Sequence, residues 1–329
     1  MVDKTKFLVN NYPVDDEMLK SFRKFGQSRF NLEIIVYVRY LSREESLGKK
    51  NKKHSLKLTL AYDTKYGNHK LYIEGSIRKW YYGKYNIRDF NYKDFCHCIT
   101  LLSKRLGVDE NILWNAEITK LETGVTIRFT KEFEGIALCV SRYKNFKKNT
   151  YEDKGVKFKG KNYHVIFYDK IREIYNDKDK LERSYDKITK NNFLFRYEIQ
   201  GHKVSGMKMF NKKVDTLLKV KNNWKYLGDN LIKTLDKVEF VDVISPEAYI
   251  NLKGSAITGM SEFLIYKGIK TIGIENTRLL IETLNPKIKP ICRKKYNEIY
   301  EKHLIEDRRN YEDIFRQKVA KKVKSICSK

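Results

Sequence analysis

Segments in which apolar and polar residues alternate recur through the first 200 residues of this 329-residue chain. An alternation of period two places successive side chains on opposite faces of a strand, so it predicts β-structure with one buried face. The longest such segment spans residues 114–129. The other predicted strands are residues 32–40, 56–63, 68–77, 135–143, 163–167 and 192–200.

Helical patterns separate these strands and then replace them. Residues 91–107 carry apolar side chains at helical spacing and end on Gly107, which is the pattern of an amphipathic helix with a glycine C-cap. Helix is also expected from residue 168 to about 188 and from 203 to 234, and it predominates from 235 onward. The predicted fold is therefore α+β, an antiparallel sheet with helices on one face. We expect two domains, residues 1–210 and a mainly helical region at 211–329.

The chain is strongly basic. Its 68 Lys and Arg residues against 41 Asp and Glu residues give a formal net charge of +27. Such a surplus costs stability through self-repulsion and is usually retained because the partner is a polyanion, with nucleic acid as the leading candidate. An anionic membrane is the rival, but residues 1–18 contain acids and a proline where a secretory signal needs an apolar run. Nothing in the sequence approaches a transmembrane segment.

The five cysteines predict neither a disulfide framework nor a structural zinc site, because their number is odd and no CxxC pair occurs. This usage is typical of a reducing compartment, so we expect a cytoplasmic protein. The sequence Cys96-His97-Cys98 resembles a ligand cluster. On a helix, however, three consecutive side chains point in different directions, which disfavours a metal site there.

Two basic segments are candidate nucleic-acid contacts. Residues 144–162 are rich in lysine and lack apolar periodicity, so they predict an exposed loop or ribbon that is either a solvated hairpin or an arm that binds phosphates. Residues 78–86, "RKWYYGKYN", combine aromatic and basic side chains, as do platforms on which single-stranded bases stack. The candidate DNA-binding residues in these segments are Arg78, Lys79, Trp80, Tyr82, Lys147, Lys148, Lys157 and Lys159.

Three predicted strands carry an acid within an apolar frame: Glu74, Glu122 and Glu198. If each glutamate lies on the face opposite its apolar neighbours, the three line one surface of the sheet. Converging carboxylates repel one another unless a divalent cation joins them, and oxygen ligands suit Mg²⁺ or Mn²⁺. The alternative, in which each acid pairs with a surface Lys or Arg, remains open, because periodicity does not distinguish the two.

The order of three motifs resembles the replication initiators of filamentous phages, the gene II protein family and its phage and plasmid relatives. That family has a strand of hydrophobic-basic-hydrophobic-acid form, then a strand that enters a helix through a tyrosine with a nearby lysine, then an Arg-aromatic-Glu strand. Here these features fall on Lys120-Leu121-Glu122, on Tyr168 with Lys170, and on Arg196-Tyr197-Glu198. The resemblance covers roughly residues 70–210 and, more weakly, the C-terminal helices.

The resemblance implies a rolling-circle initiator with a Rep nuclease-like fold, distantly related to nucleases that have a His-hydrophobic-His metal motif. Such an enzyme nicks one strand of origin DNA by tyrosine attack, leaves a 5′-phosphotyrosine and a free 3′-OH, and later rejoins the strand. It implies origin DNA as the substrate, host helicase and polymerase as further candidate partners, and the cytoplasm of a bacterial host as the location. This chain departs from the wider superfamily because His164 and His202 are isolated in the sequence, so a metal site must use carboxylates.

In this interpretation Tyr168 is the nucleophile, and Lys170 and Arg172 supply positive charge beside it. Arg172 is also a candidate DNA-binding residue. Glu122 and Glu198 hold Mg²⁺ or Mn²⁺, with Glu74 as a third ligand. Tyrosine needs such help because its free pKa is about 10.

The competing nucleophiles are Tyr82 and Tyr197. Asp169 is an anion beside Tyr168 that would oppose phenolate formation, and we expect it to act instead as a helix N-cap. A non-catalytic DNA-binding replication factor of the same fold is the alternative function. A tyrosine recombinase is disfavoured, since the last third of the chain lacks the Arg-His-Arg pattern before a tyrosine.

Overall fold

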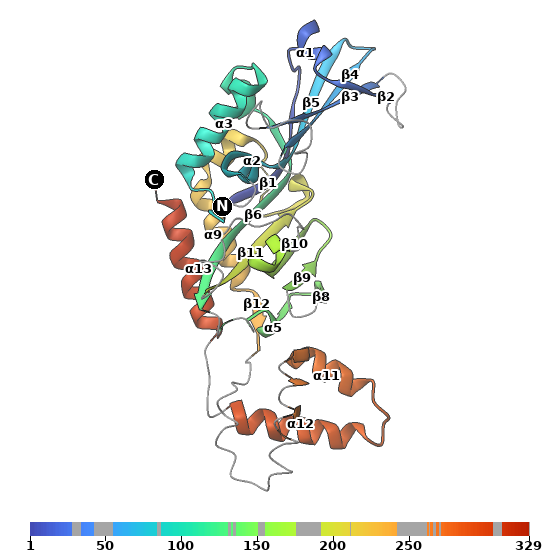
Figure 1. The fold of residues 1–329 in the computed structure, drawn as a ribbon, viewed down its shortest axis with the longest axis vertical. Coiled ribbons are helices and arrows are strands. Elements are labelled where there is room, and N and C mark those ends of the chain that lie inside the picture. The colour runs from blue at the N-terminus through green and yellow to red at the C-terminus, as the bar shows by residue number, and fades with distance from the viewer. Residues whose placement is uncertain are drawn as a thin grey trace.

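A ten-stranded antiparallel sheet organises the computed structural model of this chain (Figure 1). The strand order is β2-β3-β4-β5-β1-β6-β11-β10-β9-β8, and a separate pair is formed by β12 and β7. The structure describes residues 1–27, 34–42, 55–83, 87–130, 133, 136–150, 155–175, 192–210, 212–241, 262, 264–265, 268–269, 271–304 and 311–328. The strands are β1 Val2–Val9, β2 Arg23–Gln27, β3 Ile34–Leu41, β4 Leu56–Asp63, β5 Asn68–Ser76, β6 Glu117–Thr130, β7 Val140–Tyr143, β8 Lys147–Thr150, β9 Gly155–Lys159, β10 Tyr163–Asp169, β11 Asn192–Gly201 and β12 Val238–Phe240.

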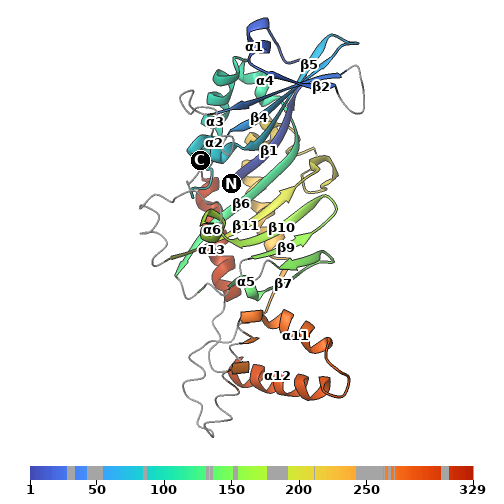
Figure 2. The same cartoon turned by 45° about the vertical axis from the view of Figure 1, so that its right-hand side comes forward.

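Helices accompany the sheet along its length (Figure 2). They are α1 Asp16–Lys20, α2 Ile77–Tyr82, α3 Tyr92–Leu106, α4 Glu110–Trp114, α5 Ile136–Cys139, α6 Lys170–Tyr175, α8 Leu217–Asn222, α9 Trp224–Leu235, α11 Ile274–Glu282, α12 Lys289–Leu304 and α13 Tyr311–Cys327, with a 3-10 turn η3 at Val204–Gly206. The prediction of an α+β fold with a large antiparallel sheet and a helical C-terminal region is confirmed. Among the described helices, none combines the length and the apolar character that a membrane crossing requires.

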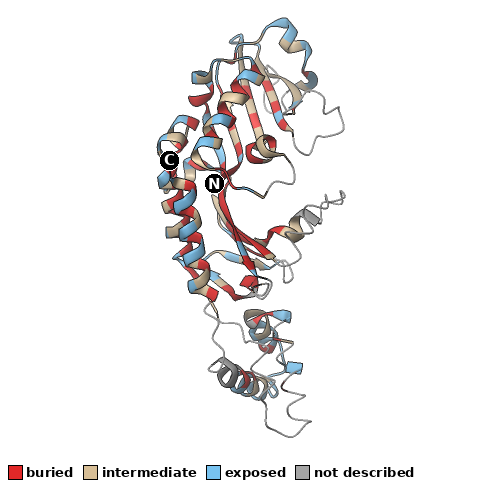
Figure 3. Ribbon diagram, turned by 60° about the vertical axis from the view of Figure 1, so that its left-hand side comes forward, coloured by how far each residue is buried: buried red, intermediate tan, exposed pale blue. Residues whose placement is uncertain are grey.

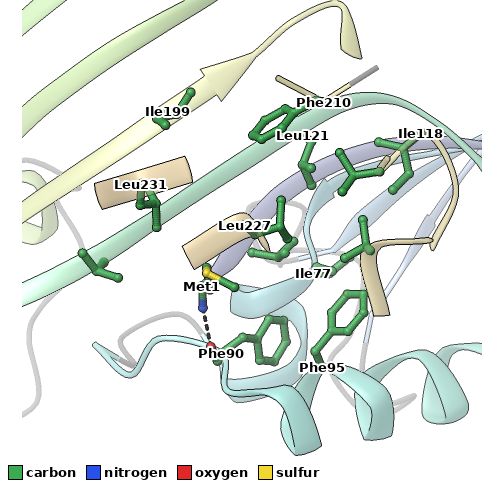
Figure 4. Close-up of a cluster of buried hydrophobic side chains, with 14 of the residues drawn as sticks. Met1, Ile77, Phe90, Phe95, Ile118, Leu121, Ile199, Phe210, Leu227 and Leu231 are labelled. Carbon is green, nitrogen blue, oxygen red and sulfur yellow. Dashed lines mark hydrogen bonds between the residues drawn. The ribbon is translucent and has the colours of Figure 1, made fainter. Parts of the chain in front are cut away.

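One face of the sheet packs against α9 and α13. On this face Leu121 and Ile199, from neighbouring strands, lie beside Leu227 and Leu231 of α9 (Figure 4). Phe315 of α13 is fully buried among aromatic rings of β6, β10 and β11. Figure 3 marks buried residues on the strands and on the helices beside them. Because apolar side chains occupy alternate strand positions, the intervening residues lie on the opposite face, which we call the open face.

The amphipathic helix predicted at 91–107 is α3. The Asn91 side chain caps its first turn by accepting from the backbone N–H of Asp94, and Gly107 ends it in the left-handed conformation with φ 67°. Glycine suits this position because a Cβ is disfavoured at positive φ. The helix expected at 203–234 is instead η3, α8 and α9, separated by turns.

The sheet also contains strands that lie outside the predicted strand ranges. The lysine-rich segment 144–162 forms the hairpin β8–β9 at the edge of the sheet, so its interpretation as a ribbon is correct. The first strand, β1, was not predicted, yet it lies at the middle of the sheet between β5 and β6. Its sequence, VDKTKFLV, lacks regular alternation, and register shifts occur where it pairs with β6.

Helices from the C-terminal part of the chain contribute to this architecture in two ways. The helices α8, α9 and α13 pack on one another or on the sheet, and β12 pairs with β7. The helices α11 and α12 pack against each other beyond the end of the sheet (Figure 1).

Candidate active site on the open face of the sheet

Strand register brings the predicted site residues together on the open face. Residues paired across neighbouring strands point to the same side, so each pairing defines a row that runs across the sheet. The first row is Glu122, Gln200, His164, Lys159 and Lys147. The second row is Gly124, Glu198, Ile166 and Lys157. The third row is Thr126, Arg196, Tyr168 and Gly155.

Tyr168, Glu198 and Arg196 share one oxygen atom. The Tyr168 hydroxyl donates to Glu198 Oε2 at 3.4 Å, and Arg196 Nε donates to the same oxygen at 2.8 Å. Burial, and then the Glu198 carboxylate, raise the pKa of Tyr168 well above its ordinary value. The hydroxyl therefore keeps its proton in this state, and Glu198 is the group placed to accept it.

Arg196 is held by two further carboxylates. Its Nη1 lies 2.9 Å from Asp89 Oδ1, and its Nη2 lies 2.9 Å from Asp3 Oδ2. Asp3 also accepts from Arg78 Nε at 2.9 Å. Burial opposes the ionisation of Asp3, but Arg78 and Arg196 outweigh it and hold the pKa of Asp3 below its ordinary value. This buried ion network fixes the guanidinium that orients Glu198.

Glu122 and Glu198 lie close enough to share one hydrogen-bonding partner. Gln200 Nε2 donates to Glu122 Oε2 at 3.1 Å and to Glu198 Oε1 at 2.8 Å. Lys4 Nζ lies 3.8 Å from Glu122 Oε2, but the Lys4 side chain is 60% exposed. Burial, followed by the charge of Glu198, raises the pKa of Glu122 well above its ordinary value. The positive charges around Glu122 are therefore too weak to stabilise its ionised form.

This charge deficit makes the site suitable for a divalent cation. Two buried carboxylates supply the oxygen ligands that Mg²⁺ and Mn²⁺ prefer, so Glu122 and Glu198 fit the expected metal. Glu74 does not join them, because it pairs instead with Lys6 Nζ at 3.4 Å and Lys120 Nζ at 3.2 Å. Within the described residues, no three His, Cys, Asp or Glu side chains are grouped to hold a metal.

Lys170 lies beside the candidate nucleophile. Its Nζ is 5.5 Å from the centroid of the Tyr168 ring, its side chain is 3% exposed, and it donates to Glu173. Burial, and then the charge of Arg196, lower the pKa of Lys170.

The start of α6 sets the surroundings of Arg172, whose side chain is 38% exposed. Asp169 Oδ1 accepts from the backbone N–H groups of Ile171 and Arg172 at 2.8 and 3.2 Å, which confirms the predicted N-cap. Arg172 Nε lies 3.3 Å from Asp169 Oδ2, so its positive charge is directed to the cap.

The predicted stacking platform at residues 78–86 is wrong for its central residues. Arg78 and Trp80 are each 1% exposed, because this face of α2 packs against β1. Lys79 Nζ lies 3.4 Å from Glu173 Oε1, and the Tyr82 hydroxyl donates to Asp94 Oδ2 at 2.5 Å. Arg78 therefore supports the site from within the protein through Asp3, and Arg78 and Trp80 do not offer stacking surfaces.

The four candidate lysines of the β8–β9 hairpin divide between the two faces. Lys147, Lys157 and Lys159 belong to the rows of the open face. Lys148 pairs with the buried Phe158 and points to the other side, where Glu275 lies near it. Burial lowers the pKa of Lys148.

The competing tyrosines occupy other environments. Tyr197 is fully buried on the helix-covered face, and its hydroxyl donates to the Leu231 carbonyl at 2.9 Å. Tyr82 is bonded to Asp94, and burial, then that hydrogen bond, raise the pKa of Tyr82. Of the three candidates, Tyr168 is the one beside the paired carboxylates.

Sequence reasoning missed two glycines that make room for the site. A Cβ on Gly124 would lie 2.6 Å from Glu198 Cβ, and one on Gly155 would lie 2.9 Å from Tyr168 Cβ. Each glycine is the cross-strand partner of the side chain that it accommodates. Glycine within a strand often marks a close approach, and "ETGV" at 122–125 carried this signal. The partners Asp3, Asp89 and Gln200 had no comparable signal.

A hollow of about 250 Å³ lies next to Glu122 on the open face. Its lining includes Lys4, Glu74, Lys120, Gln200 and His202. His202 packs against His164, with ring centroids 4.1 Å apart. The two histidines, isolated in the sequence, are therefore neighbours in the fold.

Comparison with known proteins identifies no family for this chain, so its function has to be argued from the geometry of the site. No protein-family model matches the chain, and no curated protein is similar to it.

Proposed function

We propose that the protein is a metal-dependent nuclease that nicks single-stranded DNA at a replication origin by attack of Tyr168 on a phosphodiester, and that it later rejoins the strand. The observation that carries the proposal is a tyrosine hydroxyl directed at one of two buried, closely spaced carboxylates, on the face of a basic protein that also presents lysines. The ordered motifs around Glu122, Tyr168 and Glu198 support the same function.

In the proposed step the Tyr168 oxygen bonds to phosphorus while its proton passes to Glu198 Oε2. The bond between phosphorus and the 3′ oxygen breaks, and that oxygen takes a proton from water. The products are a 5′-phosphotyrosine and a 3′-OH. A phosphotyrosyl bond retains the energy of a phosphodiester, so the reverse reaction rejoins the strand.

Glu122 and Glu198 would hold Mg²⁺ or Mn²⁺, which supplies positive charge for the oxygens of the attacked phosphate. The protein contributes orientation and charge around that centre. Arg196 fixes Glu198, and its own position is set by Asp3 and Asp89. Lys170 places a buried positive charge near the phenol ring and so favours its ionisation when phosphate approaches.

A covalent-adduct assay with DNA of random sequence tests this function, because such a pool contains the sites that the protein can nick. The full chain is incubated with Mn²⁺ and a pool of single-stranded oligonucleotides of random sequence, then denatured, and the DNA that remains attached is sequenced. We expect adducts joined through a DNA 5′ phosphate, enriched in one sequence and absent with Tyr168→Phe. DNA binding without adducts from either protein would instead favour the non-catalytic replication factor.

A further inference from the structure

A cluster of basic and imidazole side chains lies on the same open face as the two candidate metal ligands, toward the β9 side of the sheet. His164 and Lys159 are cross-strand partners on β10 and β9, and Lys157 is one pair further along the same face. His202 follows the end of β11 and packs on His164 with ring centroids 4.1 Å apart. Three segments of the chain thus converge on one position of the open face.

The electrostatic surroundings of the two imidazoles are positive. After burial, the strongest influences that lower the pKa of His164 are Lys157 and His202, and Lys159 acts in the same direction. Burial, and then Lys157 and Lys120, likewise lower the pKa of His202. Neighbouring positive charges oppose protonation here, which is the condition that an incoming anion relieves.

We infer that Lys157, Lys159, His164 and His202 form a binding subsite for a phosphodiester group of single-stranded nucleic acid. Ammonium groups and imidazole N–H groups donate to phosphate oxygens without reading a base, so the subsite positions a strand and does not specify its sequence. The subsite extends the proposed function, but it makes no use of the nicking reaction.

The spacing along β10 separates this subsite from the attacked phosphate. His164 and Tyr168 are four residues apart on one face of the strand, which corresponds to about 13 Å at ~3.3 Å per residue. The subsite therefore holds a phosphate other than the one beside Tyr168. A single-stranded DNA that contacts both the subsite and Tyr168 would lie over β9 and β10, with β8 beside it.

The test measures binding by the full-length Tyr168→Phe protein, so that no adduct forms. The probe is a fluorescent oligothymidylate, titrated at several salt concentrations against Lys157→Gln, Lys159→Gln and Lys148→Gln versions of that protein. Lys148 is the matched control, since it lies on the same hairpin but faces the other side. We expect Lys157→Gln and Lys159→Gln each to weaken binding several-fold and to lower the slope of log affinity against log salt by about 0.7. Lys148→Gln should change neither quantity.

An equal loss with all three variants would overturn the inference, because it would mean that net charge alone governs binding. A second measurement follows the imidazole NMR signals during the same titration. The signals of His164 and His202 should shift on binding. The signal of His97, which lies on α3 and is hydrogen-bonded to Tyr81, should not shift. Oligothymidylate binding that leaves His164 and His202 unperturbed would also overturn the subsite. If the binding and NMR results support the subsite while the random-pool assay gives no adduct, the proposed nuclease function is wrong and the phosphodiester subsite still stands.

Discussion

Tyr168 and Glu198 lie on neighbouring antiparallel strands, and the tyrosine hydroxyl donates to Oε2 of the glutamate across 3.4 Å. This contact is long for an O–H···O hydrogen bond, whose usual distance is about 2.7 Å. The phenol therefore gains little stability from it and can be redirected toward a phosphate at small cost. The pair is thus placed for proton transfer.

Replacing Tyr168 with Phe should remove nicking and leave the fold intact. The lost hydrogen bond should change the free energy of unfolding by less than about 1 kcal/mol, as measured by urea denaturation. Binding of oligothymidylate should stay within twofold of the parent. Tyr163 lies on the same strand, and its hydroxyl is hydrogen-bonded to that of Tyr143. The Tyr163→Phe variant is therefore the control and should still form covalent adducts. Adducts formed by Tyr168→Phe would assign the nucleophile to another residue.

Glu122→Gln should abolish adduct formation while making the protein more stable at pH 7. The folded-state pKa of Glu122 is raised, so its contribution to stability is present below the ordinary value of 4.5 and is lost as pH rises through the folded pKa. The amide has no such penalty, and we expect a gain of about 1 to 3 kcal/mol in the free energy of unfolding at neutral pH.

The advantage of Glu122→Gln should shrink as pH falls toward 4.5. Calorimetric titration with Mn²⁺ should show weaker binding to this variant than to the parent. Glu74→Gln should bind Mn²⁺ normally, because Glu74 is paired with Lys6 and Lys120. Loss of Mn²⁺ binding in Glu74→Gln would restore Glu74 as a ligand.

Alanine at Gly124 should disturb the site through the backbone of β11. Its Cβ would lie 2.6 Å from both Glu198 Cβ and the Tyr197 carbonyl oxygen, so the two strands must separate. We expect a loss of about 1 to 3 kcal/mol in unfolding free energy together with reduced nicking. Gly268→Ala is the control, since its Cβ would meet nothing within 4 Å. Equal stability of the two variants would show that β6 and β11 can adjust without cost.

His164 should make stability depend on pH between about 6.5 and 4. Burial, then Lys157, lowers the pKa of His164 from 6.5 to about 4 in the folded protein. Between these two values the unfolded chain binds a proton at His164 and the folded protein does not. The contribution of His164 to stability is therefore complete above pH 6.5 and is lost as pH falls through 4. His164→Gln should flatten the curve of urea midpoint against pH in this window. Parallel curves for parent and variant would contradict the assignment.

Much of the sheet follows from local pattern, because alternation records which face of a strand is buried. The helix α3 was recognisable for the same reason, with its stripe of apolar residues and its terminal Gly107. The strand β1 could not be recognised in this way. Its Asp3 is buried, whereas a charged residue in a strand pattern is normally assigned to the surface. Burial of Asp3 depends on Arg78 and Arg196, both remote in sequence.

The candidate site shows the same limit. Glu122, Glu198 and Tyr168 could be named from their motifs and their place on strands, but their proximity depends on the register of β6, β11 and β10. Register is set by the whole sheet, so Gln200 between the two glutamates was not foreseeable. The segment at 78–86 misled for a related reason, because its aromatic and basic composition is shared by exposed platforms and by buried, paired side chains.

The link between Asp3 and Arg196 has a consequence for synthesis on the ribosome. The two residues are separated by 193 positions, so the aspartate emerges long before its partner is made. Until then β1 can pair with β5, but the carboxylate has no partner on β11, and β6 lacks its neighbour on that side. Assembly of the site therefore has to wait until β11 has been synthesised. A nascent chain arrested before β11 should lack the site even though strands β1 to β10 have already been synthesised.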